Sequence, residues 1–375
     1  MGSRLSHARG GQYNRGVSRS TRALLGLAAV GFPLALTTGQ TPAPARPPAA
    51  APNNVTAVPG ITVGHFTLTE RPTGCTVILA ANGATGAVDV RGGAPGTAET
   101  DLLSPNNTVE RINAIVLSGG SAFGLAARHG VVQYLSEKKI GYRTSAWPVP
   151  IVPSAILYDL SIGHRPDTPP VYPTADCGYR AAQAAKAGVI EEGSVGAGAG
   201  ATVGKMLGAS RAMKGGIGSV ALVTSDGLIV AAIVAVNAVG SVVEPRTAKP
   251  VAGARTADGK GLEDPFALVR RGVLQNAPAR ENTTIGVVVT NARLTKAQAL
   301  KVTEMAHDGM ARAIVPSHTP SDGDTLFTMA TGDRTTESNV GTIGALAAEA
   351  VADAILRAVR MARGLPGYPA AGDVR

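Results

Sequence analysis

The sequence predicts a layered α/β domain in which mixed or antiparallel β-sheets are faced by helices. From about residue 60 onward, short β-branched runs alternate with alanine-rich stretches that have helical spacing. Asp226-Gly227 lies between two apolar runs and is a strong hairpin signal, which argues against a purely parallel sheet. With 375 residues, of which 44% are hydrophobic, the chain is long and apolar enough to pack such layers around a core.

The individual elements follow from local composition and spacing. Runs of β-branched and apolar residues predict strands, and residues 322–331 predict a turn followed by a strand. The expected strands are residues 61–66, 75–80, 87–91, 114–118, two runs within 218–237, 283–292 and the end of 322–331. Helical spacing predicts five helices, the second ended by Gly188 and the fourth opened by Thr295. These helices are residues 119–138, 177–188, 263–274, 295–314 and 340–363.

Composition argues against a nucleic-acid partner. Aromatic residues make up only 3% of the chain, too few for a base-stacking platform. The net charge is +9, but six arginines and no acid precede Glu70, so the rest of the chain is only mildly basic. No later segment combines a Lys/Arg cluster with aromatic residues, and we therefore expect no binding to nucleic acid.

The N-terminal region has the composition of an export signal. Residues 23–39 are apolar over about the length of a signal h-region and follow a basic leader, and residues 41–54 form a Pro/Ala linker. We therefore expect residues 1–57 to lie outside a single catalytic domain, 58–375, and the protein to be exported. The alternatives are an uncleaved anchor or a disordered extension of a cytoplasmic protein. Seventeen residues interrupted by Pro33 span a bilayer poorly, so no stable membrane partner is expected.

The cysteine and histidine content argues against a metal or another cofactor. Cys75 and Cys177 can supply one disulfide at most, and the sequence leaves open whether they pair. The six histidines are scattered, and no Cys/His cluster has the spacing of a zinc site.

The glycine-rich segment 193–206, GSVGAGAGATVGKM, departs from the phosphate-binding loops that it resembles. The Walker pattern needs glycine where Ala199 stands and Ser or Thr where Met206 stands, and the dinucleotide fingerprint fits only loosely. Two interpretations remain. The segment is either a tightly packed loop with an exposed lysine, or a set of backbone N–H groups directed at an oxyanion with Lys205 beside them.

Residues 117–127, LSGGSAFGLAA, resemble the nucleophile elbow of hydrolases without matching it. The elbow requires glycine two places after its serine, and Phe123 stands there. Ser121 is therefore interpreted as a helix N-cap or a pocket donor rather than a nucleophile.

Asp322 and Asp324 flank Gly323 in HTPSDGDTLF, residues 318–327. The segment lacks the further oxygen ligands and the closing Glu of a calcium loop. Two carboxylates this close can orient an amine or a hydroxyl and push each other's pKa apart, although solvated acids in an Asx turn have the same local pattern.

Thr283 follows Asn282 at the start of an apolar strand, and its local pattern allows three interpretations. Threonine is common in strands, and Asn-Thr-Thr is also a glycosylation sequon. The third interpretation is a hydroxyl nucleophile whose general base is its own α-amine, freed when the preceding peptide bond is cut. The pKa of such an amine is near ~8, so this chemistry requires no histidine.

Several segments together resemble the self-cleaving β-aminopeptidase and nylon-oligomer hydrolase group, peptidase family S58. The matching segments, in the family's order, are residues 87–103, 115–127, 153–160, 198–206, 235–240, 282–294 and 318–327. The Asn-Thr junction is most similar to the branch that hydrolyses nylon oligomers, since the D-aminopeptidase branch has Gly-Ser. The resemblance implies an αββα sandwich of the N-terminal-nucleophile type, commonly a tetramer of αβ units.

The resemblance also implies roles for particular residues. Self-cleavage between Asn282 and Thr283 would give an α chain ending at residue 282 and a 93-residue β chain, 283–375, with Thr283 as the nucleophile. Asp322 and Asp324 would orient the amine and hydroxyl of Thr283, Lys205 would lie beside them, and Asn237 would bind the oxyanion. The expected substrate-binding residues are Tyr158, Ser121 and Gly120.

The expected function is amide hydrolysis in short peptides or nylon-type 6-aminohexanoate oligomers. The alternatives within the same chemistry are an aminopeptidase restricted to N-terminal β-, D- or L-aminoacyl residues, and an acyltransferase that uses the same threonine. The alternative from another class is an exported binding protein without catalytic activity.

Overall fold

The computed structural model describes residues 53–276, 281–334 and 339–374. The chain divides into two units, and these residues belong to the second, Ala50–Arg375. The expected leader, the apolar segment 23–39 and nearly all of the linker lie outside the described residues. The first described element is a helical turn at Val55–Ala57 whose Val55 is already buried. None of the described helices is both long enough and apolar enough to cross a membrane.

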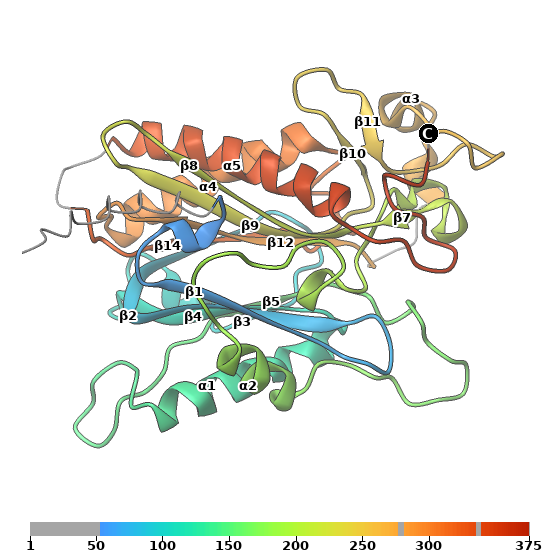
Figure 1. The fold of residues 1–375 in the computed structure, drawn as a ribbon. Helices are drawn as coiled ribbons and strands as arrows, with labels where there is room; N and C mark the ends of the chain where they lie inside the picture. The colour runs from blue at the N-terminus through green and yellow to red at the C-terminus, as the bar shows by residue number, and fades with distance from the viewer. Residues whose placement is uncertain (1–52, 277–280, 335–338, 375) are drawn as a thin grey trace, which may run out of the picture. The chain divides into compact units, whose positions relative to one another are not determined.

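Helices and strands of the second unit form four layers (Figure 1). The helices are α1 (Ala127–Glu137), α2 (Ala175–Gln183), α3 (Pro265–Arg270), α4 (Lys296–Ala313) and α5 (Val340–Arg360). The strands are β1 (Ile61–Thr67), β2 (Gly74–Val90), β3 (Thr97–Ala98), β4 (Arg111–Ser118), β5 (Ser154–Ile156), β6 (Thr202–Val203), β7 (Met213–Lys214), β8 (Gly216–Val223), β9 (Ile229–Asn237), β10 (Ser241–Val243), β11 (Pro250–Ala252), β12 (Thr283–Thr290), β13 (Ile314–Val315) and β14 (Thr325–Ala330). Figure 1 shows α4 and α5 over β8, β9, β12 and β14, and α1 and α2 beneath β1, β2, β4 and β5. The predicted αββα sandwich is confirmed.

One long strand joins the two sheet layers. The sheet order is β3-β5-β4-β2-β14-β12-β9-β8, with β1 also paired to β2. The first part of β2 pairs with β1 and β4, and its last part pairs with β14. We expected two separate strands here, 75–80 and 87–91. They are continuous because a register shift between Leu79 and Ala84, with Gly83 at φ +76°, bends the strand without ending it.

Pairing directions are mixed, as expected. β8 and β9 form the predicted antiparallel hairpin, with Gly227 of the Asp226-Gly227 turn at φ +83°. β12 pairs antiparallel with β9 and parallel with β14. The start of β12 therefore lies between the end of β9 and the start of β14.

Three apolar cores separate the four layers. Because side chains alternate along a strand, Val230, Ala232 and Val234 of β9 pack against α4 and α5, whereas Ala231 and Ile233 face the other sheet layer. A third core lies between β1, β2 and β4 and the helices α1 and α2. Strands buried on both faces explain the nearly continuous apolar runs in the sequence.

Helix boundaries are confirmed in part. Thr295 caps α4 in a capping box with Gln298, as its position predicted. The expected helix end at Gly188 is wrong, since α2 ends at Gln183. The chain leaves α2 early because Lys186 pairs with Val63 of β1, with a Val63 N to Lys186 O distance of 3.0 Å.

Cys75 and Cys177 form a disulfide, which answers a question that the sequence left open. Cys75 lies in β2 and Cys177 in α2, 102 residues apart in the sequence. The bond therefore ties the outer helix layer to the sheet.

Lys214 is a fully buried lysine that the sequence analysis missed. Its Nζ donates hydrogen bonds to the carbonyls of Gly198 at 2.8 Å, Ala201 at 2.9 Å and Gly215 at 3.1 Å. The side chain is 0% exposed, and burial lowers its pKa to about 7. The lysine holds the glycine-rich segment against the start of β8.

Replacing Lys214 with methionine is expected to lower the free energy of unfolding by about 3 kcal/mol, because three buried carbonyls lose their donor. The wild-type lysine also makes stability depend on pH. Between pH about 7 and 10.5, unfolded Lys214 binds a proton that folded Lys214 lacks, so the free energy of unfolding rises with pH. The slope from this group reaches about 1.36 kcal/mol per pH unit.

Denaturant unfolding at several pH values above about 7 measures both effects. The exposed Lys249→Met variant is the control. Equal pH slopes for the wild type and the Lys214→Met variant would contradict the assignment.

Candidate active site

Thr283 begins β12 and is opposite Asn237 at the end of β9. Its side chain is buried, with 4% of the residue exposed. The preceding residue, Asn282, forms a parallel bridge with Asp322, just before β14. The sheet therefore brings together four residues that the sequence places up to 85 positions apart, Asn237, Asn282, Thr283 and Asp322.

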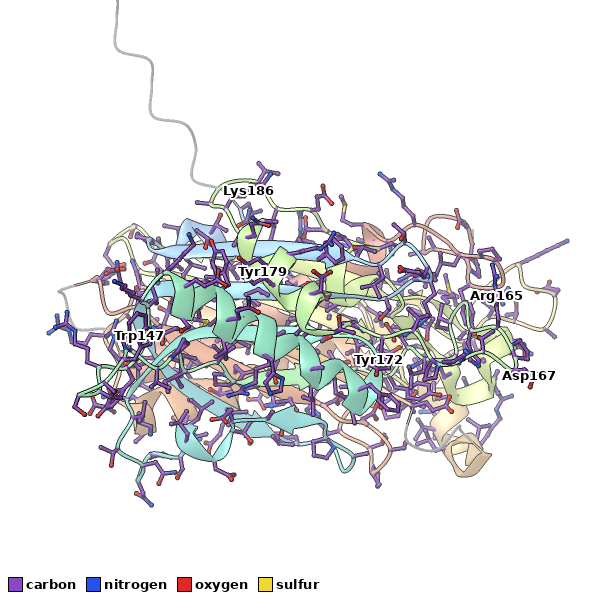
Figure 2. The ribbon with its side chains drawn as sticks, turned by 90° about the horizontal axis from the view of Figure 1, so that it is seen from below. Trp147, Arg165, Asp167, Tyr172, Tyr179 and Lys186 are labelled. Atoms are coloured by element: carbon purple, nitrogen blue, oxygen red, sulfur yellow. A yellow bond between two sulfur atoms is a disulfide. The ribbon has the colours of Figure 1, made fainter. Side chains whose placement is uncertain are left out.

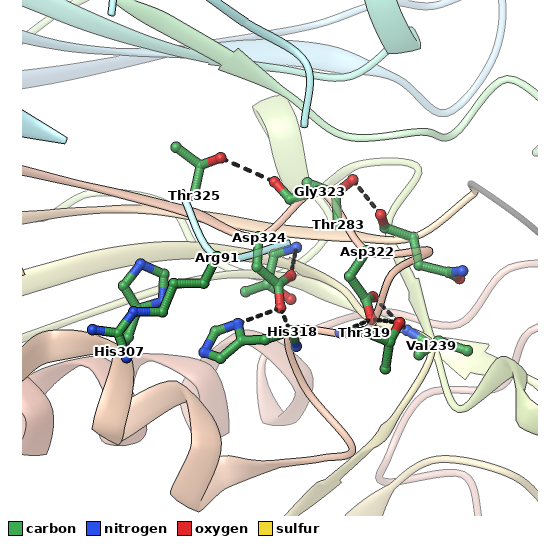
Figure 3. Close-up of polar contacts among 12 residues, drawn as sticks. Arg91, Val239, Thr283, His307, His318, Thr319, Asp322, Gly323, Asp324 and Thr325 are labelled. Atoms are coloured by element: carbon green, nitrogen blue, oxygen red, sulfur yellow. Dashed lines mark hydrogen bonds and ion pairs between the residues drawn. The ribbon is translucent and has the colours of Figure 1, made fainter. Parts of the chain in front are cut away.

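The carbonyl of Asn282 receives two hydrogen bonds. The Gly323 N–H donates to its oxygen at 2.9 Å, and the Thr283 hydroxyl donates to the same oxygen (Figure 3). A Cβ on Gly323 would lie 2.8 Å from Thr283 Oγ1 and 2.7 Å from the Ala94 carbonyl oxygen, so only glycine leaves room for the hydroxyl. The sequence analysis gave Gly323 no role, although its place between two aspartates was a signal.

The carboxylates of Asp324 and Asp322 accept hydrogen bonds from backbone groups near this junction (Figure 3). Asp324 Oδ1 accepts the Thr284 N–H at 2.7 Å, which fixes the start of β12. Asp322 Oδ1 accepts the Val239 N–H at 3.4 Å, while its Oδ2 accepts hydrogen bonds from the backbone and hydroxyl of Thr319. Burial, and then the negative charge of Asp324, raise the pKa of Asp322 to about 6.

Lys205 and Asn237 bind the backbone one residue before the junction. Lys205 Nζ donates to the carbonyl of Glu281 at 3.1 Å and to the carbonyl and side-chain oxygens of Asn237 at 2.9 and 3.0 Å. Burial lowers the pKa of Lys205 to about 7, while the negative charges of Asp322, Glu281 and Asp159 oppose this shift.

Asn237 is oriented by its neighbours rather than directed at the Asn282 carbonyl. Its Oδ1 accepts the Thr202 N–H at 2.9 Å. Its Nδ2 donates to the carbonyls of Tyr158 at 2.8 Å and Glu281 at 3.3 Å. The Gly323 N–H binds the Asn282 oxygen instead.

Tyr158 lines a small cavity of about 20 Å³ beside Lys205. Burial and the Glu281 carboxylate raise the pKa of Tyr158. The cavity is lined by Tyr158, Ser161, Ile162, Thr202, Lys205, Ala209, Glu281 and Tyr368. The tyrosine and the lysine thus lie on a common pocket, as the expected site requires.

Gly120 and Ser121 contact the two residues that flank Tyr158. The Gly120 N–H donates to Asp159 Oδ1 at 2.8 Å, and the Ser121 N–H donates to the Leu157 carbonyl at 3.0 Å. Neither is among the described residues that line the cavity beside Lys205. The expectation that Ser121 is a helix N-cap is wrong, since it is the first residue of a 3-10 helix, with φ +53°, and Gly120 occupies the cap position.

A buried ion pair that the sequence analysis missed fixes the Tyr158 segment. Arg71 Nη2 lies 2.9 Å from Asp159 Oδ1, and both side chains are buried. Thr73 also donates to Asp159, at 2.7 Å. No local pattern marks Arg71 or Thr73, because their partner is more than 80 residues away. Within the described parts of the chain, no group of three His, Cys, Asp or Glu side chains is placed to hold a metal ion.

Comparisons with known proteins identify relatives of the chain. Residues 53–371 match the model of Peptidase family S58. The chain is 39% identical over 350 residues to an uncharacterized aminopeptidase of Mycobacterium tuberculosis (strain ATCC 25618 / H37Rv), covering 86% of this chain and 98% of that one. It is 33% identical over 316 residues to a 6-aminohexanoate-oligomer endohydrolase of Kocuria sp. (strain KY2), covering 80% and 84%.

Solved structures agree on the fold. A Burkholderia sp. beta-aminopeptidase superposes with a TM-score of 0.60 at 24% identity, covering 83% of this chain and 87% of that one. An L-aminopeptidase D-Ala-esterase/amidase from Ochrobactrum anthropi, described as a variant of the Ntn-hydrolase fold, gives a TM-score of 0.61 at 18% identity, covering 85% and 90%. The predicted hydrolase class and fold are confirmed, and the chain belongs to peptidase family S58.

Proposed function

We propose that the chain cuts itself between Asn282 and Thr283 and then hydrolyses amide bonds with the new N-terminal threonine. The observation that carries this proposal is the contact between the Thr283 hydroxyl and the Asn282 carbonyl, which also accepts the Gly323 N–H at 2.9 Å. A buried hydroxyl beside a polarised carbonyl is what an intramolecular acyl shift requires.

Self-cleavage begins with attack of Thr283 Oγ1 on the carbonyl carbon of Asn282. The Gly323 N–H stabilises the negative charge that develops on the carbonyl oxygen. The C–N bond then breaks, the nitrogen of Thr283 takes up the proton that the hydroxyl loses, and an ester links Asn282 to Thr283. Water hydrolyses the ester and leaves a carboxylate on Asn282 and a free amine on Thr283.

In the mature enzyme, the free amine of Thr283 takes the proton of its own hydroxyl as the oxygen attacks a substrate amide. The amine portion of the substrate leaves with a proton, and water then releases the acyl portion. Substrate atoms on the acyl side would lie where Glu281 and Asn282 lie in the uncut chain. Lys205, Asn237 and Gly323 can then donate to them as they donate to the uncut backbone.

The expected substrates are short peptides or 6-aminohexanoate oligomers. Relatives of both kinds are known, namely an uncharacterized aminopeptidase and an oligomer endohydrolase. An aminopeptidase would be restricted to β-, D- or L-aminoacyl groups at a free N-terminus. A panel of such amides beside 6-aminohexanoate oligomers separates the two, because only an endo-acting enzyme cuts internal bonds of an oligomer.

The direct test of the proposal is the intact mass of the purified wild-type protein. We expect two chains, one of them the 93 residues 283–375 with threonine at its N-terminus. A chain that stays whole at position 282 would refute the proposal and favour a binding protein. Transfer of the acyl group to an added amine, in preference to water, would instead indicate an acyltransferase.

We also propose that the protein is exported. The disulfide between Cys75 and Cys177 supports this location, because such bonds persist in oxidising compartments. Fractionation of the source cells tests it, and a reduced, full-length protein in the cytoplasm would argue against it.

The assembly is proposed to be a homo-oligomer of αβ units. Exposed aromatic side chains support this proposal, because aromatic residues are enriched in contacts between subunits. One of them is Trp147, which is 49% exposed near one end of the face that carries α1 and α2 (Figure 2). Light scattering of the purified protein measures the assembly directly, and the mass of one αβ unit would contradict it.

A further inference from the structure

We propose that His318 is a positioning residue that holds Asp324, and through it the start of β12, in the geometry required for attack by Thr283. This inference rests on the proposed function. Asp324 contacts the backbone beside the nucleophile, since its Oδ1 accepts the Thr284 N–H at 2.7 Å. Whatever fixes the carboxylate therefore fixes the position of Thr283.

His318 makes two hydrogen bonds to the same carboxylate oxygen. Its backbone N–H lies 2.8 Å from Asp324 Oδ2, and its ring Nδ1 lies 2.9 Å from that oxygen (Figure 3). With Asp324 as a carboxylate, the ring proton belongs on Nδ1, because an ionised carboxylate only accepts hydrogen bonds. The two oxygens of Asp324 then have separate tasks, with Oδ2 held by His318 and Oδ1 holding β12.

The backbone of His318 is in a conformation that few side chains adopt. Its φ is +55°, in the left-handed region that costs a non-glycine residue free energy. This conformation lets the N–H and the ring of one residue converge on one oxygen. Asparagine tolerates the same region and carries a side-chain N–H at a comparable reach, so it is the natural replacement that retains the donor.

Of the two ring nitrogens of His318, Nδ1 is the one that contacts Asp324. Within the described residues, Nε2 of His318 is buried and has no hydrogen-bond partner. The ring instead packs edge-on against His307, with ring centroids 4.8 Å apart. Burial lowers the pKa of His307 to about 4, and its Nε2 lies 3.1 Å from the Asp89 carbonyl oxygen. His307 thus packs against the ring of His318, while its own hydrogen bond is made to Asp89 and not to Asp324.

The other charged groups near Asp324 are directed elsewhere. Arg91 forms an ion pair with Asp89 at 2.8 Å and donates to the Glu304 carbonyl. The second carboxylate, Asp322, is held by Thr319 and Val239, and the charge of Lys205 acts on it. Among the described side chains, His318 is the cationic or N–H donor group that hydrogen-bonds Asp324.

Removing the ring takes away one of the two hydrogen bonds that hold Asp324 Oδ2, so the carboxylate fixes the Thr284 N–H less firmly. In a His318→Gly variant, which suits the positive φ, self-cleavage should therefore be about tenfold slower than in the wild type.

The test uses full-length chains made by cell-free synthesis, with the rate of the split followed on denaturing gels. His318→Asn, which keeps a side-chain N–H donor, should split at close to the wild-type rate. His307→Ala removes a ring that packs against His318 but no hydrogen bond to Asp324, and it should also split at close to the wild-type rate. Circular dichroism checks folding, and if His318→Gly does not fold, His318→Ala takes its place.

The outcomes separate this inference from the proposed function. A wild-type rate for the glycine variant, or equal slowing in His318→Gly and His318→Asn, would overturn the positioning role while the wild type still splits. A wild type that never splits would remove the proposed function and this inference together.

Discussion

A Thr283→Ala chain is expected to stay whole and to lose amide hydrolysis by about 10⁴-fold or more, because it removes both the nucleophile and the reaction that frees its amine. Intact mass and turnover of a model amide measure the two losses separately. A Thr283→Ser chain keeps a hydroxyl at the same place and should still split. It should split more slowly than the wild type, because the lost methyl group no longer restricts the side-chain rotamer.

The neighbouring threonine provides a matched control. Thr284 has a buried hydroxyl with no hydrogen-bond partner among the described residues, and its contact with Asp324 is made by the backbone. Thr284→Val should therefore split as the wild type does. A Thr284→Val chain that stays whole, or a Thr283→Ala chain that splits, would show that the hydroxyl of Thr283 is not the nucleophile.

The sequence predicted the layers well because their signals are local. Capping at Thr295, the Asp226-Gly227 turn and the apolar runs of β9 and β12 each depend on neighbours a few residues away. Two of the errors at element boundaries came from contacts between distant segments. The pairing of Lys186 with Val63 ends α2 early, and pairing with β4 and β14 keeps β2 continuous across its bend.

The candidate site could be predicted only in part, for the same physical reason. The resemblance named Lys205, Asn237 and both aspartates, and the fold gathers them around Thr283. Gly323 and His318 were missed, because a glycine N–H donor and a histidine that acts on a carboxylate have no distinctive spacing. Their roles appear only when β14 is placed beside β12.

A Lys205→Met chain is expected to split about 10²- to 10³-fold more slowly than the wild type, similar to the loss of an oxyanion donor elsewhere. Lys205 donates to the Glu281 carbonyl at 3.1 Å and to both oxygens of Asn237. Without the ammonium group, the Glu281 carbonyl loses its charged hydrogen-bond donor, and Asn237 loses its fixed orientation. Methionine fills the space of the lysine stem up to the ammonium group, so the loss reflects mainly the ammonium group rather than a large cavity.

A Lys296→Met variant tests whether slower self-cleavage is a general consequence of losing a buried lysine. Lys296 is also buried, and its Nζ donates to the carbonyls of Leu102 at 3.0 Å and Asn107 at 2.8 Å, neither of which lies in a strand. Lys296→Met should lower stability yet leave the rate of self-cleavage of the folded protein within about threefold of the wild type. Of the two lysines, it is Lys205 that contacts the backbone of Glu281, next to Asn282. If both variants split at the same rate, Lys205 therefore acts on folding and not on the proposed reaction.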